Sequence, residues 1–121
     1  GRLLGFRTRG KNSCGDRSYS TYRASISETK QMTFEWNEEK RSQNYDKHGV
    51  DLLEAALIFE GPTLTRVDDR RDYGEVRYIS LGLVDDVPYV VVHTERGENT
   101  RLISAWRGGR KDYEAYKNCF P

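Results

Sequence analysis

The chain has 121 residues, the length of a single domain. Apolar residues make up 36% of it and charged residues 32%, so any hydrophobic core is small. No stretch approaches the ~18 consecutive apolar residues of a membrane helix, and no apolar segment near the start resembles a secretory signal. We therefore expect a cytoplasmic protein without a membrane segment.

The two cysteines, Cys14 and Cys119, lie near opposite ends of the chain. Two cysteines make no disulfide framework, and their spacing does not suit a metal site. We expect both to be unpaired cytosolic thiols. No Asp, Glu and His cluster has metal-ligand spacing either, so we expect no metal and no cofactor.

The net charge of +1 hides an asymmetry. Residues 1–31 hold seven basic and two acidic residues, whereas residues 32–121 hold thirteen and seventeen. DNA affinity rests largely on phosphate neutralisation, so this acidic balance, with no helix-turn-helix pattern, argues against a DNA-binding regulator. Nucleic-acid binding by residues 32–121 would depend on local clusters of basic side chains.

Residues 1–31 show neither helical nor strand periodicity, and Gly, Ser, Thr and Arg dominate them. Such a segment buries too little apolar surface to offset the entropy lost on ordering. The only methionine is Met32, where organised patterning begins. We expect residues 1–31 to be a disordered basic extension, from an expression vector or from upstream translation, and residues 32–121 to be the folded domain. A basic arm that contacts RNA is the alternative.

An edge strand and a polar helix come first in the predicted domain. Residues 32–36 alternate apolar and polar side chains, which is typical of a short strand. Asn37 is a good N-cap for a helix that runs to about His48, where Gly49 supplies a left-handed stop. The only strongly apolar residue of this helix is Tyr45, so we expect it to contribute little burial.

A second helix, capped by Asp51, is predicted over residues 52–59 and is apolar nearly all round, as a core element would be. A short strand over 63–67 and a charged loop over 68–74 follow it. The chain then predicts three strands and a closing helix, over residues 75–84, 87–95, 100–107 and 108–119.

The turns between these three strands fix a predicted register. A two-residue turn at 85–86 sets Leu81 opposite Val90, and a four-residue turn sets Val92 opposite Ile103. One face is then apolar and should pack under the helices: Ile79, Leu81, Leu83, Val90, Val92, Ile103 and Ala105.

The end row of that apolar face is Arg77, Thr94 and Arg101, which packing alone does not explain. The opposite face mixes aromatic residues, hydroxyls and a histidine, with Tyr78 beside His93. It also aligns Gly82, Tyr89 and Trp106. Aromatic platforms beside cations suit unstacked RNA bases, whereas ordinary cross-strand pairs on a half-solvated sheet explain the same pattern.

Three motifs resemble those of BrnT toxins, the ribonucleases of the BrnT–BrnA type II toxin–antitoxin system. In chain order they are "FEWNEEKRSQNYDKHGV", "GEVRYISLG" and "VVVHTERGENTRLISAWR". The resemblance runs from Met32 onward and leaves residues 1–31 without a counterpart. The sequence departs from the family pattern at Trp106, where the family often has a basic residue.

The resemblance implies an α+β fold similar to RelE toxins. It implies a small antiparallel sheet of three to five strands, with two N-terminal helices and a C-terminal helix. It also implies cleavage of RNA, which inhibits translation and arrests growth until a cognate BrnA-like antitoxin binds and supplies the contacts to operator DNA. The alternative is a degenerate, non-catalytic module that only binds an antitoxin.

Metal-independent RNA cleavage requires a base for the 2′-hydroxyl, cations for the charged transition state and an acid for the leaving oxygen. Arg77 and Arg101 are our first candidates for the scissile phosphate, because arginine forks match phosphate oxygens. Lys47 adds positive charge. His48 or His93 is the candidate acid or base, because histidine titrates near neutral pH.

Further candidates support these roles. Glu75 would orient Arg77 or serve as the base, and Arg96 and Arg107 are secondary phosphate ligands. The candidates for stacking on RNA bases are Tyr78 and Trp106.

Each candidate has a structural alternative. Glu75 and Arg77 would form an ordinary ion pair, and His48 would be favoured at a helix C-terminus by the helix dipole. His93 would be a satisfied histidine of the sheet, and Arg107 a solvated charge.

Overall fold

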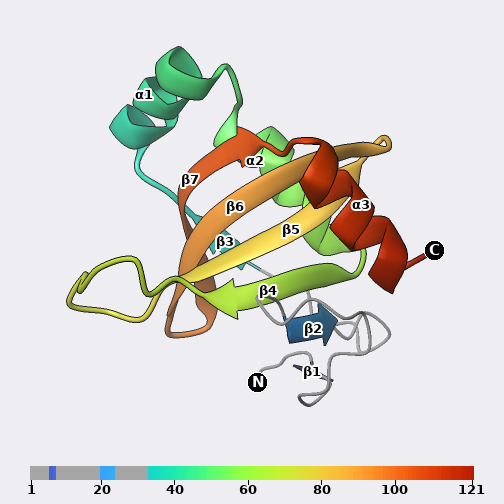
Figure 1. Ribbon diagram of the computed structural model, residues 1–121. Coiled ribbons are helices and arrows are strands. Elements are labelled where there is room, and N and C mark those ends of the chain that lie inside the picture. The colour runs from blue at the N-terminus through green and yellow to red at the C-terminus, as the bar shows by residue number, and fades with distance from the viewer. Residues whose placement is uncertain (1–5, 8–19, 24–32) are drawn as a thin grey trace.

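The computed structural model describes residues 6–7, 20–23 and 33–121. In these residues a mixed seven-stranded sheet runs in the order β1-β2-β4-β5-β6-β7-β3, and helices cover both of its faces (Figure 1). The strands are β1 (Phe6–Arg7), β2 (Ser20–Arg23), β3 (Thr33–Glu35), β4 (Thr63–Val67), β5 (Tyr78–Val84), β6 (Val87–Arg96) and β7 (Asn99–Arg107). The helices are α1 (Glu38–His48), α2 (Leu52–Ala55), the 3₁₀ helix η2 (Ala56–Glu60) and α3 (Arg110–Cys119).

The α+β class is confirmed, but the predicted arrangement of strands and helices is wrong. The sheet is not purely antiparallel, because β3 pairs in parallel with β7 at its edge. The helices do not precede the sheet as an N-terminal pair: α1, α2 and η2 all lie between β3 and β4. The single helix predicted over 52–59 divides into a four-residue α-helix and a 3₁₀ segment.

Helix α1 begins and ends where its capping residues predict. The Asn37 side chain accepts a hydrogen bond from the Lys40 backbone N–H at 3.0 Å. Gly49 has a φ of 71°, in the left-handed region, and its N–H donates to the Tyr45 carbonyl at 2.8 Å. These two ends fix the direction in which Lys47 and His48 leave the last turn.

The residue that anchors α1 is polar, which the hydrophobic pattern could not indicate. Tyr45 is 58% exposed, whereas Asn44 is 6% exposed. The Asn44 amide donates to the carbonyls of Val50 and Ala105 at 3.0 and 2.9 Å. Its oxygen accepts from the Ser104 hydroxyl at 3.0 Å and from the Ala105 N–H at 3.2 Å. The Asn44 side chain thus pairs with both the N–H and the carbonyl of Ala105, as the backbone of a neighbouring strand would.

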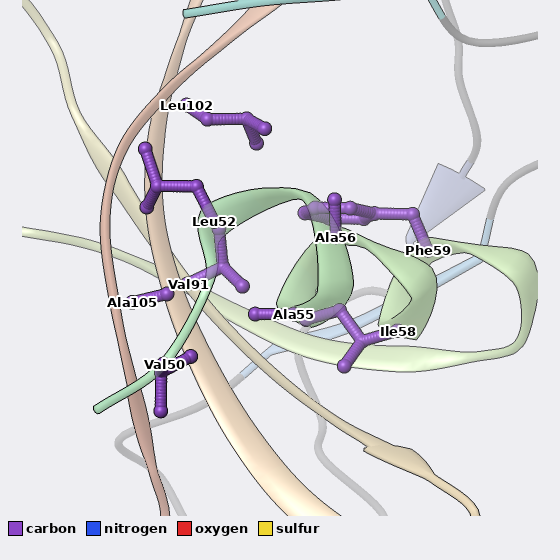
Figure 2. Packing of buried hydrophobic residues seen from close by; sticks show 9 residues of the cluster. All are labelled: Val50, Leu52, Ala55, Ala56, Ile58, Phe59, Val91, Leu102 and Ala105. Atoms are coloured by element: carbon purple, nitrogen blue, oxygen red, sulfur yellow. The ribbon is translucent and has the colours of Figure 1, made fainter. Parts of the chain in front are cut away.

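One core lies between the sheet and the α2–η2 segment (Figure 2). Leu52, Ile58 and Phe59 pack there against Val91 of β6 and against β7. The approach to β5 is close, because a Cβ atom on Gly82 would lie 2.7 Å from the Ile58 Cβ. The nine buried members are Val50, Leu52, Ala55, Ala56, Ile58, Phe59, Val91, Leu102 and Ala105.

A second core lies on the other face of the sheet, under α3 (Figure 1). Tyr116 of α3 is buried there, and its hydroxyl donates to the Pro62 carbonyl at 2.7 Å. Its other buried members are Leu64, Ile79, Leu81, Val90 and Val92. Helix α3 covers only part of this face, and the uncovered part carries the site described below.

The predicted register holds for the first hairpin and fails inside the second. Leu81 pairs with Val90 as expected, across a turn in which Asp85 and Asp86 both have positive φ. Between β6 and β7 the register shifts at Val92 and His93.

The shift means that Val92 faces Ser104, not the predicted Ile103, because β7 contains one extra residue at this irregularity. One extra residue moves every later side chain of β7 to the other face. Ala105 therefore joins the α2–η2 core, and Trp106 joins the opposite face. The predicted row of Gly82, Tyr89 and Trp106 is wrong, since Tyr89 faces Arg107.

Other expectations concern the chain ends. The prediction of unpaired thiols is wrong for Cys119, which is disulfide-bonded, and Cys14 lies outside the described residues. The prediction rested on the rarity of disulfides in reducing compartments, which is a general tendency and does not decide a single cysteine. Most of residues 1–31, and Met32, also lie outside the described residues, so the domain division remains a prediction. In the described chain, no helix is long and apolar enough to cross a membrane.

Candidate functional site

A groove of about 790 Å³ opens on the sheet face that α3 leaves uncovered. The C-terminal end of α1, strand β7 and the loop between β4 and β5 form its walls. Basic and aromatic side chains dominate the lining, and no carboxylate is among the described residues that line it. The lining residues are Lys47, His48, Arg70, Tyr73, Arg77, Val92, Ile103, Ser104, Trp106 and Arg107.

Trp106 lies in this groove because of the irregularity in β7. Its ring centroid is 5.9 Å from that of His48, with the rings tilted by 44°. The Arg70 guanidinium carbon lies 6.0 Å from the Trp106 ring centroid, a distance at which a cation–π attraction acts. The indole is half-buried and is bordered by two groups that carry or can carry positive charge.

Two arginines come from the charged loop between β4 and β5. Arg70 forms a bidentate ion pair with Asp68, at 2.8 and 2.9 Å, and the Asp68 side chain is fully buried. The Arg70 guanidinium lowers the pKa of Asp68 to about 2, so this carboxylate is charged at neutral pH. Arg77 donates to Glu75 at 3.0 Å and lies 4.2 Å over the Tyr73 ring. These contacts hold both guanidinium groups at the groove.

Lys47 and His48 occupy the last turn of α1, and both side chains are exposed. Cations are favoured at a helix C-terminus, where the helix dipole places partial negative charge. Among the described residues, Lys47, His48 and Arg107 take part in no ion pair, so the charges of Lys47 and Arg107 are not offset by a contacting carboxylate.

Arg101 and Arg96 lie apart from this group, in a second, smaller cavity of about 80 Å³. Their nitrogens approach Glu35 at 3.7 and 3.9 Å. Glu75 also lines this cavity, and Arg77 lines both cavities. Strand β5 begins only at Tyr78, so Arg77 lies just outside the ladder, whereas Thr94 pairs with Arg101 as predicted.

The structure does not bring His93 to the groove. His93 is 3% exposed, lies edge-on to Phe59 at 5.0 Å and shares a 2.7 Å hydrogen bond between its Nε2 and the Ser80 hydroxyl. Burial lowers its pKa to about 3. Tyr78 stacks on it at 5.7 Å and is not among the groove-lining residues either.

Sequence reasoning missed Arg70, Tyr73 and Asn44. The run "DDRRDY" had marked a charged loop, but no pattern indicated that Arg70 would be held by a buried aspartate. Asn44 belongs to the first motif quoted above, and its spacing along the helix gave no sign of its contacts with β7.

The geometry defines a class of protein, a small α+β domain with a groove lined by basic and aromatic side chains. The groove gathers several basic side chains around an aromatic ring without a lining carboxylate, as nucleic-acid backbones and bases require. Comparison with protein families matches residues 36–112 to the ribonuclease toxin BrnT of type II toxin–antitoxin systems. The chain belongs to this family of ribonuclease toxins. A comparison with curated proteins found no match.

Proposed function

We propose that this chain cleaves single-stranded RNA in the groove between α1, β7 and the β4–β5 loop. The observation that carries the proposal is the lining, in which basic side chains surround Trp106 and no described carboxylate intervenes. Unpaired bases stack on aromatic side chains while cations follow the phosphates, so this groove suits an unpaired RNA strand.

Arg77 is the proposed ligand of the scissile phosphate. It reaches the groove with only 24% of its side chain exposed, and its contacts with Glu75 and Tyr73 fix its guanidinium plane. A preorganised cation stabilises the extra negative charge of the pentacoordinate transition state without reorganising during the reaction. Lys47 and Arg107 also line the groove and add positive charge.

His48 is the proposed acid or base, because it is the imidazole that lies in the groove. A histidine can take the 2′-hydroxyl proton or give one to the leaving 5′-oxygen near neutral pH. His93 has no part in the proposal, since it is enclosed in the core on the other face. Glu75 keeps a supporting role, through its ion pair with Arg77.

The reaction we propose needs no metal ion. A magnesium ion in a nuclease is held by carboxylates, whereas the described lining of this groove is basic and would repel a divalent cation. The charge that a metal would supply to the transition state is provided here by guanidinium and ammonium groups.

As the toxin of a type II pair, the chain would act in the cytoplasm, where RNA cleavage inhibits translation. Its proposed partner is a BrnA-like antitoxin in a hetero-oligomer, and contacts with operator DNA would come from that antitoxin. The acidic balance of residues 32–121 fits this division of labour, because it does not favour direct binding to duplex DNA.

The test is incubation of the purified protein with bulk RNA in EDTA, with and without the cognate antitoxin. We expect cleavage in EDTA and its loss on addition of the antitoxin. Intact RNA under all conditions would contradict the enzyme and favour a module that only binds the antitoxin. Cleavage that appears only with added magnesium would contradict the metal-independent reaction alone.

A further inference from the structure

The second cavity lies directly beside the groove. Arg77 and Ile103 line both spaces, so Arg77 forms part of the wall between them. The cavity is lined by the start of α1, the residues before β5, the end of β6 and the first half of β7. A chain that occupies the groove would therefore reach this cavity by passing Arg77.

The charges around the cavity are unbalanced. Four basic residues line it, against the single lining carboxylate of Glu75. The lining residues are Asn37, Lys40, Glu75, Arg77, Arg96, Arg101, Leu102 and Ile103. Glu75 is already paired with Arg77 at 3.0 Å, and Glu35 is the only other described carboxylate in an ion pair with a lining residue. The cavity keeps an excess of positive charge.

Two of the three arginines that line the cavity, Arg96 and Arg101, are loosely held. Arg96 and Arg101 share Glu35 at 3.9 and 3.7 Å, beyond hydrogen-bond distance. Arg41 shows the contrasting case, because it binds Asp51 through two hydrogen bonds of 2.8 and 3.0 Å. The guanidinium donors of Arg96 and Arg101 are therefore available to an anion with better geometry.

We propose that this cavity is a phosphate subsite, which binds a phosphate of the RNA backbone next to the one cleaved in the groove. This proposal rests on the proposed function. The cavity is about a tenth as large as the groove, about 80 Å³ against about 790 Å³, and a space of this size suits a small anion such as one phosphate group. The RNA backbone then runs from Trp106 past Arg77 to Arg96 and Arg101.

The test measures binding of a 2′-O-methyl RNA oligonucleotide, which cannot be cleaved, by fluorescence anisotropy over a range of salt concentrations. The variant is the double substitution Arg96→Ala and Arg101→Ala, with Arg110→Ala, an exposed residue of α3, as the matched control. We expect the double variant to bind about tenfold more weakly and to lower the salt slope by ~0.7 for the lost phosphate contact. The same oligonucleotide with uncharged methylphosphonate linkages should show no difference between the proteins.

An unchanged affinity and salt slope in the double variant would overturn the subsite. So would weaker binding of the antitoxin with unchanged RNA binding, which would assign the cavity to the protein partner. If the double variant melts at a lower temperature by circular dichroism, the single substitution Arg96→Gln, at a residue whose side chain is 49% exposed, replaces it. Cleavage of bulk RNA by the unmodified protein is scored separately, so failure of the proposed function is distinguishable from failure of the subsite.

Discussion

The two histidines of the chain lie on opposite faces of the sheet and differ in their exposure to solvent. On the α2–η2 face, His93 is enclosed by Phe59 and Tyr78, and burial keeps it neutral. On the other face, His48 is exposed beside Trp106 in a groove of basic side chains. A histidine in a conspicuous strand position is thus a core residue here, and the one at the helix end is the candidate for chemistry.

The difference arises from how completely each face is covered. The α2–η2 segment closes over its face, so that Gly82 of β5 nearly touches Ile58. Helix α3 covers its face only in part (Figure 1). The irregularity in β7 turns Trp106 toward the groove on the open part of that face. One face of the sheet is therefore a closed core, and the other face leaves room for an open groove lined by basic side chains.

The largest expected effect is a loss of RNA cleavage when Arg77 is removed from the groove. Arg77→Ala should lower the rate of RNA cleavage by roughly 100- to 1,000-fold, because removing one preorganised donor to a charged transition state typically lowers the rate by about that factor. Growth arrest on expression should be lost in parallel. The measurement is the initial rate on bulk RNA, together with a thermal melt to show that the domain stays folded.

The matched control for Arg77 is Arg110→Ala, since Arg110 is exposed on α3 and forms a long ion pair of 3.8 Å with Glu114. Its rate should equal that of the unmodified protein. If Arg77→Ala cleaves as fast as the control, the groove is not the site of cleavage.

A smaller effect is expected where α1 is anchored to the sheet. Asn44→Ala removes four hydrogen bonds and leaves buried backbone groups of β7 unpaired, so the free energy of unfolding should fall by about 2–4 kcal/mol. Tyr45→Ala, at the neighbouring exposed position, should change it by about 0.5 kcal/mol or less. Urea denaturation of the two variants checks this, and equal losses would contradict an anchor at Asn44.

Gly82→Ala tests the closed face. The new methyl group would lie 2.7 Å from the Ile58 Cβ, so η2 must move away from β5. Overpacking of this kind costs about 1–3 kcal/mol of unfolding free energy. Two substitutions at Ile58, each combined with Gly82→Ala, identify the clashing atom. Ile58→Val keeps the Cβ atom and should leave the clash with the new methyl group in place, whereas Ile58→Gly removes the Cβ atom and should relieve that clash. A stability equal to that of the unmodified protein would show that η2 packs loosely.

Local chemistry in the sequence predicts the ends of elements well. The cap at Asn37, the left-handed stop at Gly49 and the tight turn at 85–86 all lie where expected, because each depends on a few neighbouring residues. The parallel pairing of β3 with β7 depends on contacts between distant parts of the chain, and nothing in residues 33–35 encodes it.

The candidate site was predictable in composition and less so in arrangement. Lys47, His48, Arg77, Arg107 and Trp106 do meet in one groove. Trp106 was expected on the wrong face, because the alternation rule cannot detect an extra residue inside a strand. Two readings of His93 stayed open in the sequence, an acid or base and a satisfied histidine of the sheet, because periodicity assigns a face and does not reveal which helix covers it.

The burial of His93 should appear as a pH dependence of stability. Its pKa is about 3 in the folded chain and near the ordinary 6.5 in the unfolded chain, so between these values the unfolded state binds the extra proton. The free energy of unfolding should therefore fall as the pH falls from about 6.5 toward 3, by at most ~1.4 kcal/mol per pH unit. His93→Gln should flatten this slope, whatever its effect on stability at pH 7.

Urea denaturation between pH 5 and 6.5 isolates the imidazole contribution, because the pKa of Asp68 is lowered to about 2 and that carboxylate titrates below this window. His48→Gln is the matched control. It removes the exposed histidine of the groove, which is not enclosed by the core, and should leave the slope nearly as steep. If His48→Gln flattens the slope and His93→Gln does not, the roles assigned to the two faces are reversed.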